Sequence, residues 1–360
     1  MKIDNNNQLA PFIRWACIFI IIGGMKIASD ILTPFFLALF ISIIASQPVN
    51  WLIKKGIPKS ISIILVMLVL VTFGVFVGGI IGTSISQFTQ NLPLLDQSFK
   101  ENITSFTVSI NKLGFNFSDA RIASLIDPGK ILQFTATTIS SMGNILGQTL
   151  IIILISLFVL FELDSFPIKY KVVSKNNENK KRKKYNFTAI INNVRSYLYV
   201  KTMISLAAGI LTAVGLKILG IQYAFFWGLI AFLMNYIPNI GSILAALPVV
   251  AFALIGYGFE KVIWTIAIYL FINIIESIVE PKIMGNDFGL STLVVLLSLL
   301  FWGWVFGPIG MFLSVPFTMI LKIILETNDQ SQWLSTWLNS EKNIRKQWKE
   351  IQNNEENKVV

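Results

Sequence analysis

The stretch NYIPNIGS, residues 235–242, lies inside a run of 39 residues, 221–259, that contains no Lys, Arg, Asp or Glu. An unbroken helix over this run would be about 58 Å long, whereas the hydrocarbon core of a bilayer is about 30 Å thick. The run must therefore break or fold back. Asn235, Pro238 and Gly241 are residue types that end helices and form turns, so the break is predicted at 235–242.

A second uncharged run, residues 288–321, has Gly303, Gly307, Pro308 and Gly310 near its middle. Each interrupted run is either a re-entrant hairpin or a kinked span with an extended end. Broken helices are tolerated in membranes only where their backbone is buried in protein or lines a cavity. We therefore interpret both breaks as pointers to a binding site, with a purely structural kink as the alternative.

The composition of the whole chain is that of a membrane protein. Hydrophobic residues make up 54% and charged residues only 13%, about half the charged share of an average soluble protein. Long uncharged runs are typical of membrane spans. Ordinary spans are predicted at 12–29, 31–49, 60–81, 139–161, 196–219 and 262–279. With the two interrupted runs, the sequence predicts an all-α integral membrane protein of about eight membrane segments.

The net charge of +10 is concentrated in one linker, residues 164–195, which holds nine Lys or Arg against two acids. Because positively charged loops stay in the cytoplasm, this bias indicates topology rather than nucleic-acid binding. We expect membrane lipids as partners, no nucleic acid, and both termini in the cytoplasm. Lys201 and Lys217 lie near the ends of the span at 196–219, where they can snorkel, so neither has a predicted transport role.

Two further segments have a helical period outside the spans. Apolar residues recur at steps of three and four within 83–130, which predicts an amphipathic helix on the far side of the membrane. It is a connector or an oligomer contact. The tail after 326 has Trp333, Trp337 and Trp348 at spacings that favour an interfacial helix. The predicted division is 1–82 (first helices), 83–138 (extracytoplasmic segment), 139–163 (membrane helix), 164–195 (basic linker), 196–325 (core transport helices) and 326–360 (tail).

Several chemistries are absent from the chain. It has no histidine and one cysteine, Cys17, which removes His-based triads, thiolate metal clusters and intrachain disulfides. No Gly-rich loop ending in Gly-Lys-Ser or Gly-Lys-Thr occurs, so ATP hydrolysis is not expected. The sequence therefore predicts neither an enzyme nor a cofactor or metal. Transport by this chain would use a gradient or a separate energising subunit.

Polar side chains in apolar surroundings gather on one predicted helix. Asn273, Glu276 and Glu280 follow at i, i+3 and i+7, which places them on one face. Carboxylates near a bilayer are costly unless they are paired, hydrated or protonated, so both are candidates for proton or cation coupling. Alternatively, Glu280 pairs with Lys282 or lies at the interface.

These motifs resemble the autoinducer-2 exporter (AI-2E) family of bacterial permeases. The resemblance rests on NYIPNIGS (235–242), EPKIMG (280–285), GLSTL (289–293), FWGW (301–304), GPIGM (307–311) and YLYVKT (197–202). It extends in weaker form over nearly the whole chain. It implies an inner-membrane permease, a homo-oligomer, that exports a small polar signalling molecule. Related members are similar to cation/proton antiporters.

Three hypotheses follow. The first is gradient-driven export of a small polar solute such as autoinducer-2. The second is Na⁺(Li⁺)/H⁺ antiport carried by Glu276 and Glu280, and the third is a non-transporting membrane scaffold. The predicted substrate or ion pathway consists of Asn235, Pro238, Asn239, Gly241, Ser242, Asn273, Glu276, Glu280, Pro281, Lys282, Gly285, Gly303, Gly307, Pro308 and Gly310.

Overall fold

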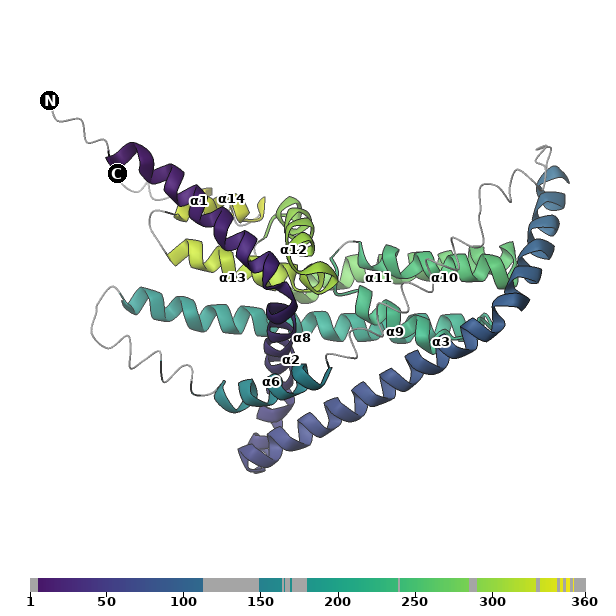
Figure 1. The fold of residues 1–360 in the computed structure, drawn as a ribbon, viewed down its shortest axis with the longest axis horizontal. Helices are drawn as coiled ribbons and strands as arrows, with labels where there is room; N and C mark the ends of the chain where they lie inside the picture. The colour runs from purple at the N-terminus through teal and green to yellow at the C-terminus, as the bar shows by residue number, and fades with distance from the viewer. Residues whose placement is uncertain are drawn as a thin grey trace. The chain divides into compact units, whose positions relative to one another are not determined.

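The computed structural model describes residues 6–112, 149–163, 165, 169, 180–238, 240–284, 290–327, 331–341, 344–345, 348–349 and 352. Apart from one isolated bridge between Leu290 and Asn339, these residues form helices and their connections, which confirms the all-α prediction. The helices (Figure 1) are α1 (Asn6–Ile27), α2 (Ser29–Lys54), α3 (Lys59–Lys112), α6 (Thr149–Glu162), α8 (Lys180–Ile218), α9 (Ala224–Met234), α10 (Gly241–Tyr257), α11 (Phe259–Met284), α12 (Thr292–Phe312), α13 (Ser314–Thr327) and α14 (Gln332–Leu338).

Five of the described helices are long and apolar enough to cross a bilayer, namely α2, α3, α8, α11 and α12. Shorter apolar helices are found at Ala16–Ile27, Thr149–Glu162, Ala224–Met234 and Gly241–Tyr257. The chain is therefore a multi-pass helical membrane protein. Among the described residues, the other predicted membrane segments correspond to shorter apolar helices or to runs divided at a break.

The chain divides into two compact units, each described by itself here. One unit contains residues 1–47, 151–194 and 289–360, and the other contains residues 48–150 and 195–288. Each unit includes one of the two interrupted runs. The predicted six-part division remains a prediction.

In the second unit, the interrupted run 221–259 folds into a helical hairpin made of α9 and α10. The backbone N–H of Gln222 donates to the Tyr257 hydroxyl at 2.7 Å, although the two residues are 35 positions apart. A straight helix would separate them by about 52 Å. The rings of Trp227 and Phe252 lie 5.6 Å apart between the two arms. Of the two predicted options, the hairpin is the one that the structure shows.

The interrupted run of the first unit also folds back, at Gly307. The indole N–H of Trp302 donates to the Thr318 hydroxyl at 3.1 Å across 16 positions, where a straight helix would separate them by about 24 Å. Gly307 has φ 67° and ψ −150°, a backbone conformation that favours glycine. One arm consists of residues 292–306 of α12, and the other consists of residues 308–312 and α13. The two arms are in contact, since the ring centres of Trp302 and Phe317 lie 4.8 Å apart.

Pro308 explains an unusual contact at this second bend. Proline has no N–H, so the carbonyl of Trp304, four residues earlier, cannot receive the usual helical hydrogen bond. The amine of Lys26 on α1 donates to that carbonyl and also lies 5.8 Å from the centre of the Trp304 ring. An amine from a neighbouring helix therefore satisfies the backbone group that the proline leaves free.

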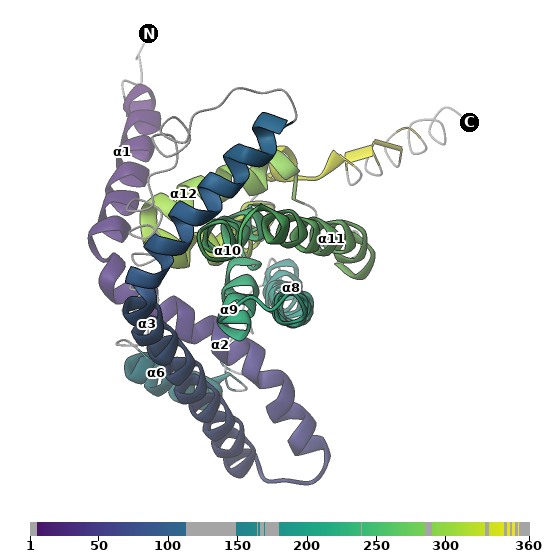
Figure 2. The same cartoon turned by 90° about the vertical axis from the view of Figure 1, so that its right-hand side faces the viewer.

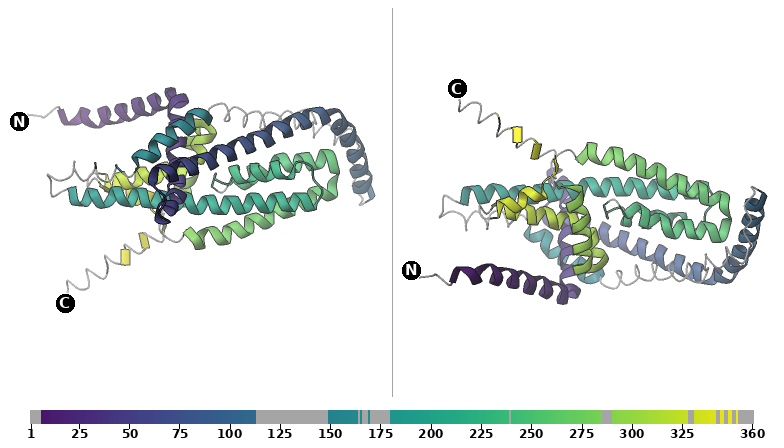
Figure 3. Two further views of the ribbon diagram at one scale, coloured as in Figure 1. Left: turned by 90° about the horizontal axis from the view of Figure 1, so that it is seen from below. Right: turned by 90° about the horizontal axis from the view of Figure 1, so that it is seen from above.

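Close helix contacts in the second unit depend on small residues. A Cβ on Gly209 of α8 would lie 2.7 Å from the Gly228 carbonyl, and a Cβ on Gly228 of α9 would lie 2.6 Å from the Ala213 Cβ. The backbones of α8 and α9 therefore touch, as is common for membrane helices with small residues at their interface. Figure 3 shows α8, α10 and α11 running alongside one another. In Figure 2 the same three helices are seen nearly end-on.

Two segments with a predicted helical period are partly described. An amphipathic helix is predicted within 83–130. Its described part, up to Lys112, belongs to α3, which continues without a break from the third predicted span. Figure 1 shows α3 bending in its second half, which contains Pro93. In the tail, Trp333 and Trp337 on α14 are 62% and 77% exposed, as an interfacial helix requires.

We predict that Gly241→Ala destabilises the α9–α10 hairpin severely. A Cβ at this position would lie 1.9 Å from the Met234 carbonyl oxygen, so the backbone itself must move. Size-exclusion chromatography of the heated, detergent-purified variant should show early aggregation. Gly79→Ala on α3 is the matched control, because a Cβ there meets nothing within 4 Å. Equal heat resistance of the two variants would contradict the hairpin geometry.

We predict that Thr212→Val stabilises the protein. The Thr212 hydroxyl on α8 is buried and has no hydrogen-bond partner among the described residues. Replacing it by a methyl group removes the desolvation cost of that hydroxyl, about 1 kcal/mol. The free energy of unfolding by SDS titration should rise accordingly. Thr202→Val, which removes the acceptor of the Tyr236 hydroxyl, should lower it instead.

Candidate functional site

The tip of the α9–α10 hairpin presents polar groups to α8 and α11. Helix α9 ends at Met234, and Pro238 lies in the turn that follows, where a missing N–H is tolerated. Asn235 and Tyr236 are both buried in this turn. We define the hairpin tip as the described residues of 235–242. Buried amide and hydroxyl groups need hydrogen-bond partners, and α8 and α11 supply them.

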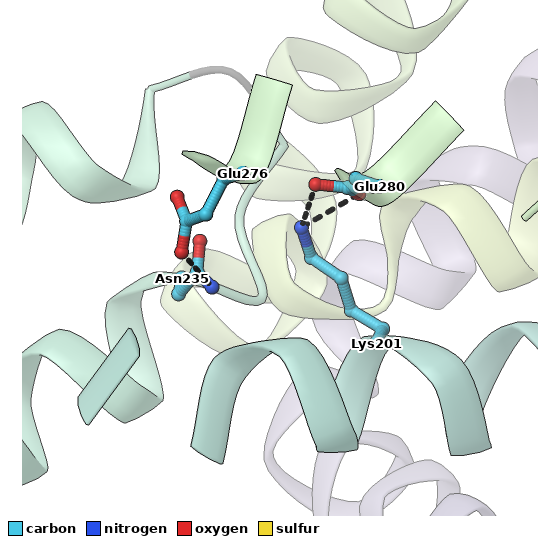
Figure 4. Close-up of polar contacts among 4 residues, drawn as sticks. All are labelled: Lys201, Asn235, Glu276 and Glu280. Atoms are coloured by element: carbon cyan, nitrogen blue, oxygen red, sulfur yellow. Dashed lines mark hydrogen bonds and ion pairs between the residues drawn. The ribbon is translucent and has the colours of Figure 1, made fainter. Parts of the chain in front are cut away.

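Helix α11 contacts the hairpin tip with the face that the sequence predicted. The side-chain amide of Asn235 donates to the Glu276 carboxylate at 2.8 Å (Figure 4). One turn earlier, the amide of Asn273 donates to the Ser242 hydroxyl at 2.6 Å. The i, i+3 spacing thus brings Asn273 and Glu276 against the two ends of the same turn. When Glu276 is ionised, this hydrogen bond is stronger than one between neutral groups.

Glu280 is bound by Lys201 of α8 rather than by Lys282. The Lys201 ammonium lies 2.8 Å and 3.0 Å from the two carboxylate oxygens of Glu280 (Figure 4). The Lys201 side chain is only 2% exposed and that of Glu280 is 28% exposed. The prediction that Lys201 snorkels was therefore wrong, because a carboxylate on the opposing helix holds the ammonium inside the unit. Pairing of Glu280 with Lys282, which is exposed, was also not found.

A third contact joins the hairpin tip to α8. The Tyr236 hydroxyl donates to the Thr202 hydroxyl at 2.8 Å, and Thr202 donates in turn to the Leu198 carbonyl. Thr202 follows Lys201 directly in the sequence. Two adjacent residues of α8 therefore reach two different elements, one the tip and the other α11.

The remaining predicted pathway residues fall into three groups. Asn239 and Gly285 lie outside the described residues, and Pro281 belongs to the last turn of α11. Gly241 begins α10 and is buried against Met234. Gly303, Gly307, Pro308 and Gly310 form the bend of the α12–α13 hairpin in the other unit. The bend is closely packed, since a Cβ on Gly310 would lie 1.9 Å from the Trp302 carbonyl oxygen.

Sequence reasoning missed Lys201, Thr202 and Tyr236. All three lie within the motifs YLYVKT and NYIPNIGS, which the resemblance had singled out. The available signal was the position of Lys201 inside an apolar span, which makes an ionisable residue a candidate for function. Because Lys201 lies close to the start of the span, the same position is also compatible with a side chain that snorkels to the interface.

The polar cluster at the hairpin tip has an excess of negative charge. Lys201 contributes one positive charge, and Glu276 and Glu280 contribute one negative charge each when ionised. Such a cluster favours uptake of one further positive charge, because uncompensated charge is costly away from water. Its amide and hydroxyl groups can also hydrogen-bond an uncharged polar solute.

Comparisons with known proteins agree over almost the whole chain. A family profile described as AI-2E family transporter matches residues 15–329. The chain is 35% identical over 336 residues to the AI-2 transport protein TqsA of Escherichia coli K12, covering 92% of this chain and 96% of the relative. It is 35% identical over 332 residues to a putative transport protein of Haemophilus influenzae, covering 90% and 94%. It is 31% identical over 316 residues to the putative transport protein YhhT of E. coli K12, covering 88% and 90%.

We predict that Lys201→Met lowers the free energy of unfolding by about 3 kcal/mol, because it leaves Glu280 partly buried without its counter-charge. The double variant Lys201→Met/Glu280→Gln should recover most of this loss. Lys217→Met is the matched control, since Lys217 is exposed on the same helix. The measurement is SDS titration of the purified protein, and equal losses in the single and double variants would contradict a structural ion pair.

Proposed function

This chain belongs to the AI-2E transporter family, and we propose that it is a secondary transporter that exports a small polar solute across the bacterial cytoplasmic membrane. Membership makes it a transporter rather than an enzyme. The sequence contains no loop of the kind that binds ATP for hydrolysis, and we propose that a gradient rather than a separate energising subunit supplies the energy. The scaffold hypothesis has no use for a polar cluster at a helix break.

The observation that carries the proposal is the hairpin tip. A helix break inside an apolar unit brings Asn235, Tyr236 and Ser242 against polar residues of α8 and α11. Broken helices at the bilayer midplane are the typical solute sites of secondary transporters. Side-chain amides and hydroxyls both donate and accept hydrogen bonds, which suits a small solute rich in oxygen atoms.

Autoinducer-2 is the solute that we propose to test first. The relative TqsA is called an AI-2 transport protein, and the chain covers 96% of its length. Export of this compound would give the protein a part in quorum sensing. We further propose that the protein works as a homo-oligomer, in which the part of α3 beyond the span, up to Lys112, contributes the contact between subunits.

The orientation that we propose follows from the positively charged linker. With residues 164–195 in the cytoplasm, α8 begins there and the α9–α10 hairpin opens toward the opposite face. The hairpin tip then lies toward the cytoplasmic end of α8, where Lys201 and Thr202 are found. A solute leaving the cell would meet this tip first. Both termini are cytoplasmic in this arrangement.

A second candidate function is exchange of Na⁺ or Li⁺ for protons. The excess negative charge at Glu276 and Glu280 supports it, because carboxylates bind both protons and small cations. The two functions also combine, since an outward solute flux can be driven by an inward proton flux at the same cluster.

Flux measurements on full-length protein in proteoliposomes test the proposal. Vesicles loaded with autoinducer-2 should release it faster than protein-free vesicles when a pH gradient is imposed. Asn235→Ala should reduce this rate about tenfold, because one side-chain hydrogen bond to the solute, about 1.4 kcal/mol, is lost. A parallel set loaded with Na⁺ or Li⁺ tests the second candidate. Release at the protein-free rate in every set would refute transport of these substances.

A further inference from the structure

The two carboxylates of α11 lie one turn apart but have different partners. Glu280 receives both of its contacts from the full positive charge of Lys201, at 2.8 Å and 3.0 Å. Glu276 accepts a hydrogen bond from the neutral amide of Asn235 at 2.8 Å. Protonation of Glu280 would leave the ammonium of Lys201, which is 2% exposed, without its counter-charge. Protonation of Glu276 leaves no buried charge unpaired.

Charge balance leads to the same distinction. With all three groups ionised, Lys201, Glu276 and Glu280 sum to one negative charge. One proton on Glu276 brings the cluster to zero, whereas a proton on Glu280 also breaks an ion pair. In a medium of low dielectric constant the neutral arrangement with an intact ion pair is favoured. The site therefore has a place for one exchangeable proton.

We propose that Glu276 is the residue that takes up and releases the coupled proton, whereas Glu280 stays ionised and holds Lys201 in position. This inference rests on the proposed transport function and assigns separate roles to the two carboxylates. The step is an acid–base exchange in which a proton from one side of the membrane adds to a Glu276 carboxylate oxygen. The same proton leaves from that oxygen to the other side.

The other ionisable groups near Glu276 do not compete for this role. On α8, Lys201 forms an ion pair with Glu280, and Tyr197 is a buried phenol. From the hairpin tip, the Tyr236 hydroxyl donates to Thr202. Phenols are neutral near pH 7, so neither tyrosine carries a charge there. On α11 itself, Lys282 is exposed and belongs to the last turn of the helix.

Proton uptake at Glu276 would act directly on the hairpin. Asn235 belongs to the tip, and its amide donates to the carboxylate of Glu276 on α11. Charge-assisted hydrogen bonds are about twice as strong as neutral ones. A protonated Glu276 therefore holds the tip more weakly than an ionised one. The proton thus loosens one contact of the hairpin tip while the Lys201–Glu280 pair still joins α8 to α11.

The test compares solute flux and proton flux in the same proteoliposomes, with full-length protein, autoinducer-2 inside and a pH-sensitive dye. In the wild type, solute release should move protons in the opposite direction. In Glu276→Gln, the number of protons moved per solute molecule released should fall at least tenfold. Glu260→Gln is the matched control, since Glu260 is exposed in the first turn of the same helix, and it should behave like the wild type.

The inference is overturned if Glu276→Gln moves protons as the wild type does. Loss of proton coupling in Lys201→Met/Glu280→Gln with retention in Glu276→Gln would assign the exchange to Glu280 instead. A wild type that moves neither autoinducer-2 nor Na⁺ or Li⁺ would refute the proposed function, and the vesicle test would then not bear on Glu276.

A second measurement does not depend on transport. It tests the role of Glu276 even if the wild type moves none of these substances or if a variant is inactive. Hydrogen exchange of the hairpin-tip amides, corrected for the intrinsic rate, should increase in the wild type as the pH is lowered and Glu276 becomes protonated. In Glu276→Gln, which is always neutral, the corrected rate should be independent of pH. A wild-type tip whose corrected exchange does not change with pH would overturn the inference.

Discussion

A helix that stops inside an apolar environment must satisfy the backbone and side-chain polar groups at its end, and this constraint governs the second unit. The break at 235–242 exists because 39 uncharged residues cannot form one straight span. Its polar groups then require partners, which α8 supplies through Thr202 and α11 through Asn273 and Glu276. The polar cluster is thus a consequence of the fold as well as a candidate site.

The sequence predicts those features that depend on one segment alone. The break positions follow from run length and from Pro238, Gly307 and Pro308, and the shared face of Asn273 and Glu276 follows from the helical period. It could not separate a hairpin from a kinked span, because both options leave the carboxy terminus in the cytoplasm. That choice depends on long-range contacts such as the one between Gln222 and Tyr257.

Lys201 shows the same boundary between local and long-range information. The helical period of α8 determines which residues share a face with Lys201. Whether that face is buried depends on the residues that α11 places opposite it. A lysine near a span end facing lipid would extend to the interface, whereas one that faces Glu280 stays buried. Pairing across helices, and therefore the different partners of Glu276 and Glu280, cannot be predicted from the sequence of one helix.

The two hairpin glycines, Gly241 and Gly310, also limit how this sequence can evolve. At each position a Cβ would lie 1.9 Å from a backbone carbonyl oxygen seven or eight residues earlier. Every amino-acid replacement of a glycine introduces a Cβ, so neither position accepts another residue without a shift of the backbone. Clashes of this kind do not restrict the other residues of the hairpin tip. Substrate preference can therefore diverge among descendants of this chain while both glycines stay fixed.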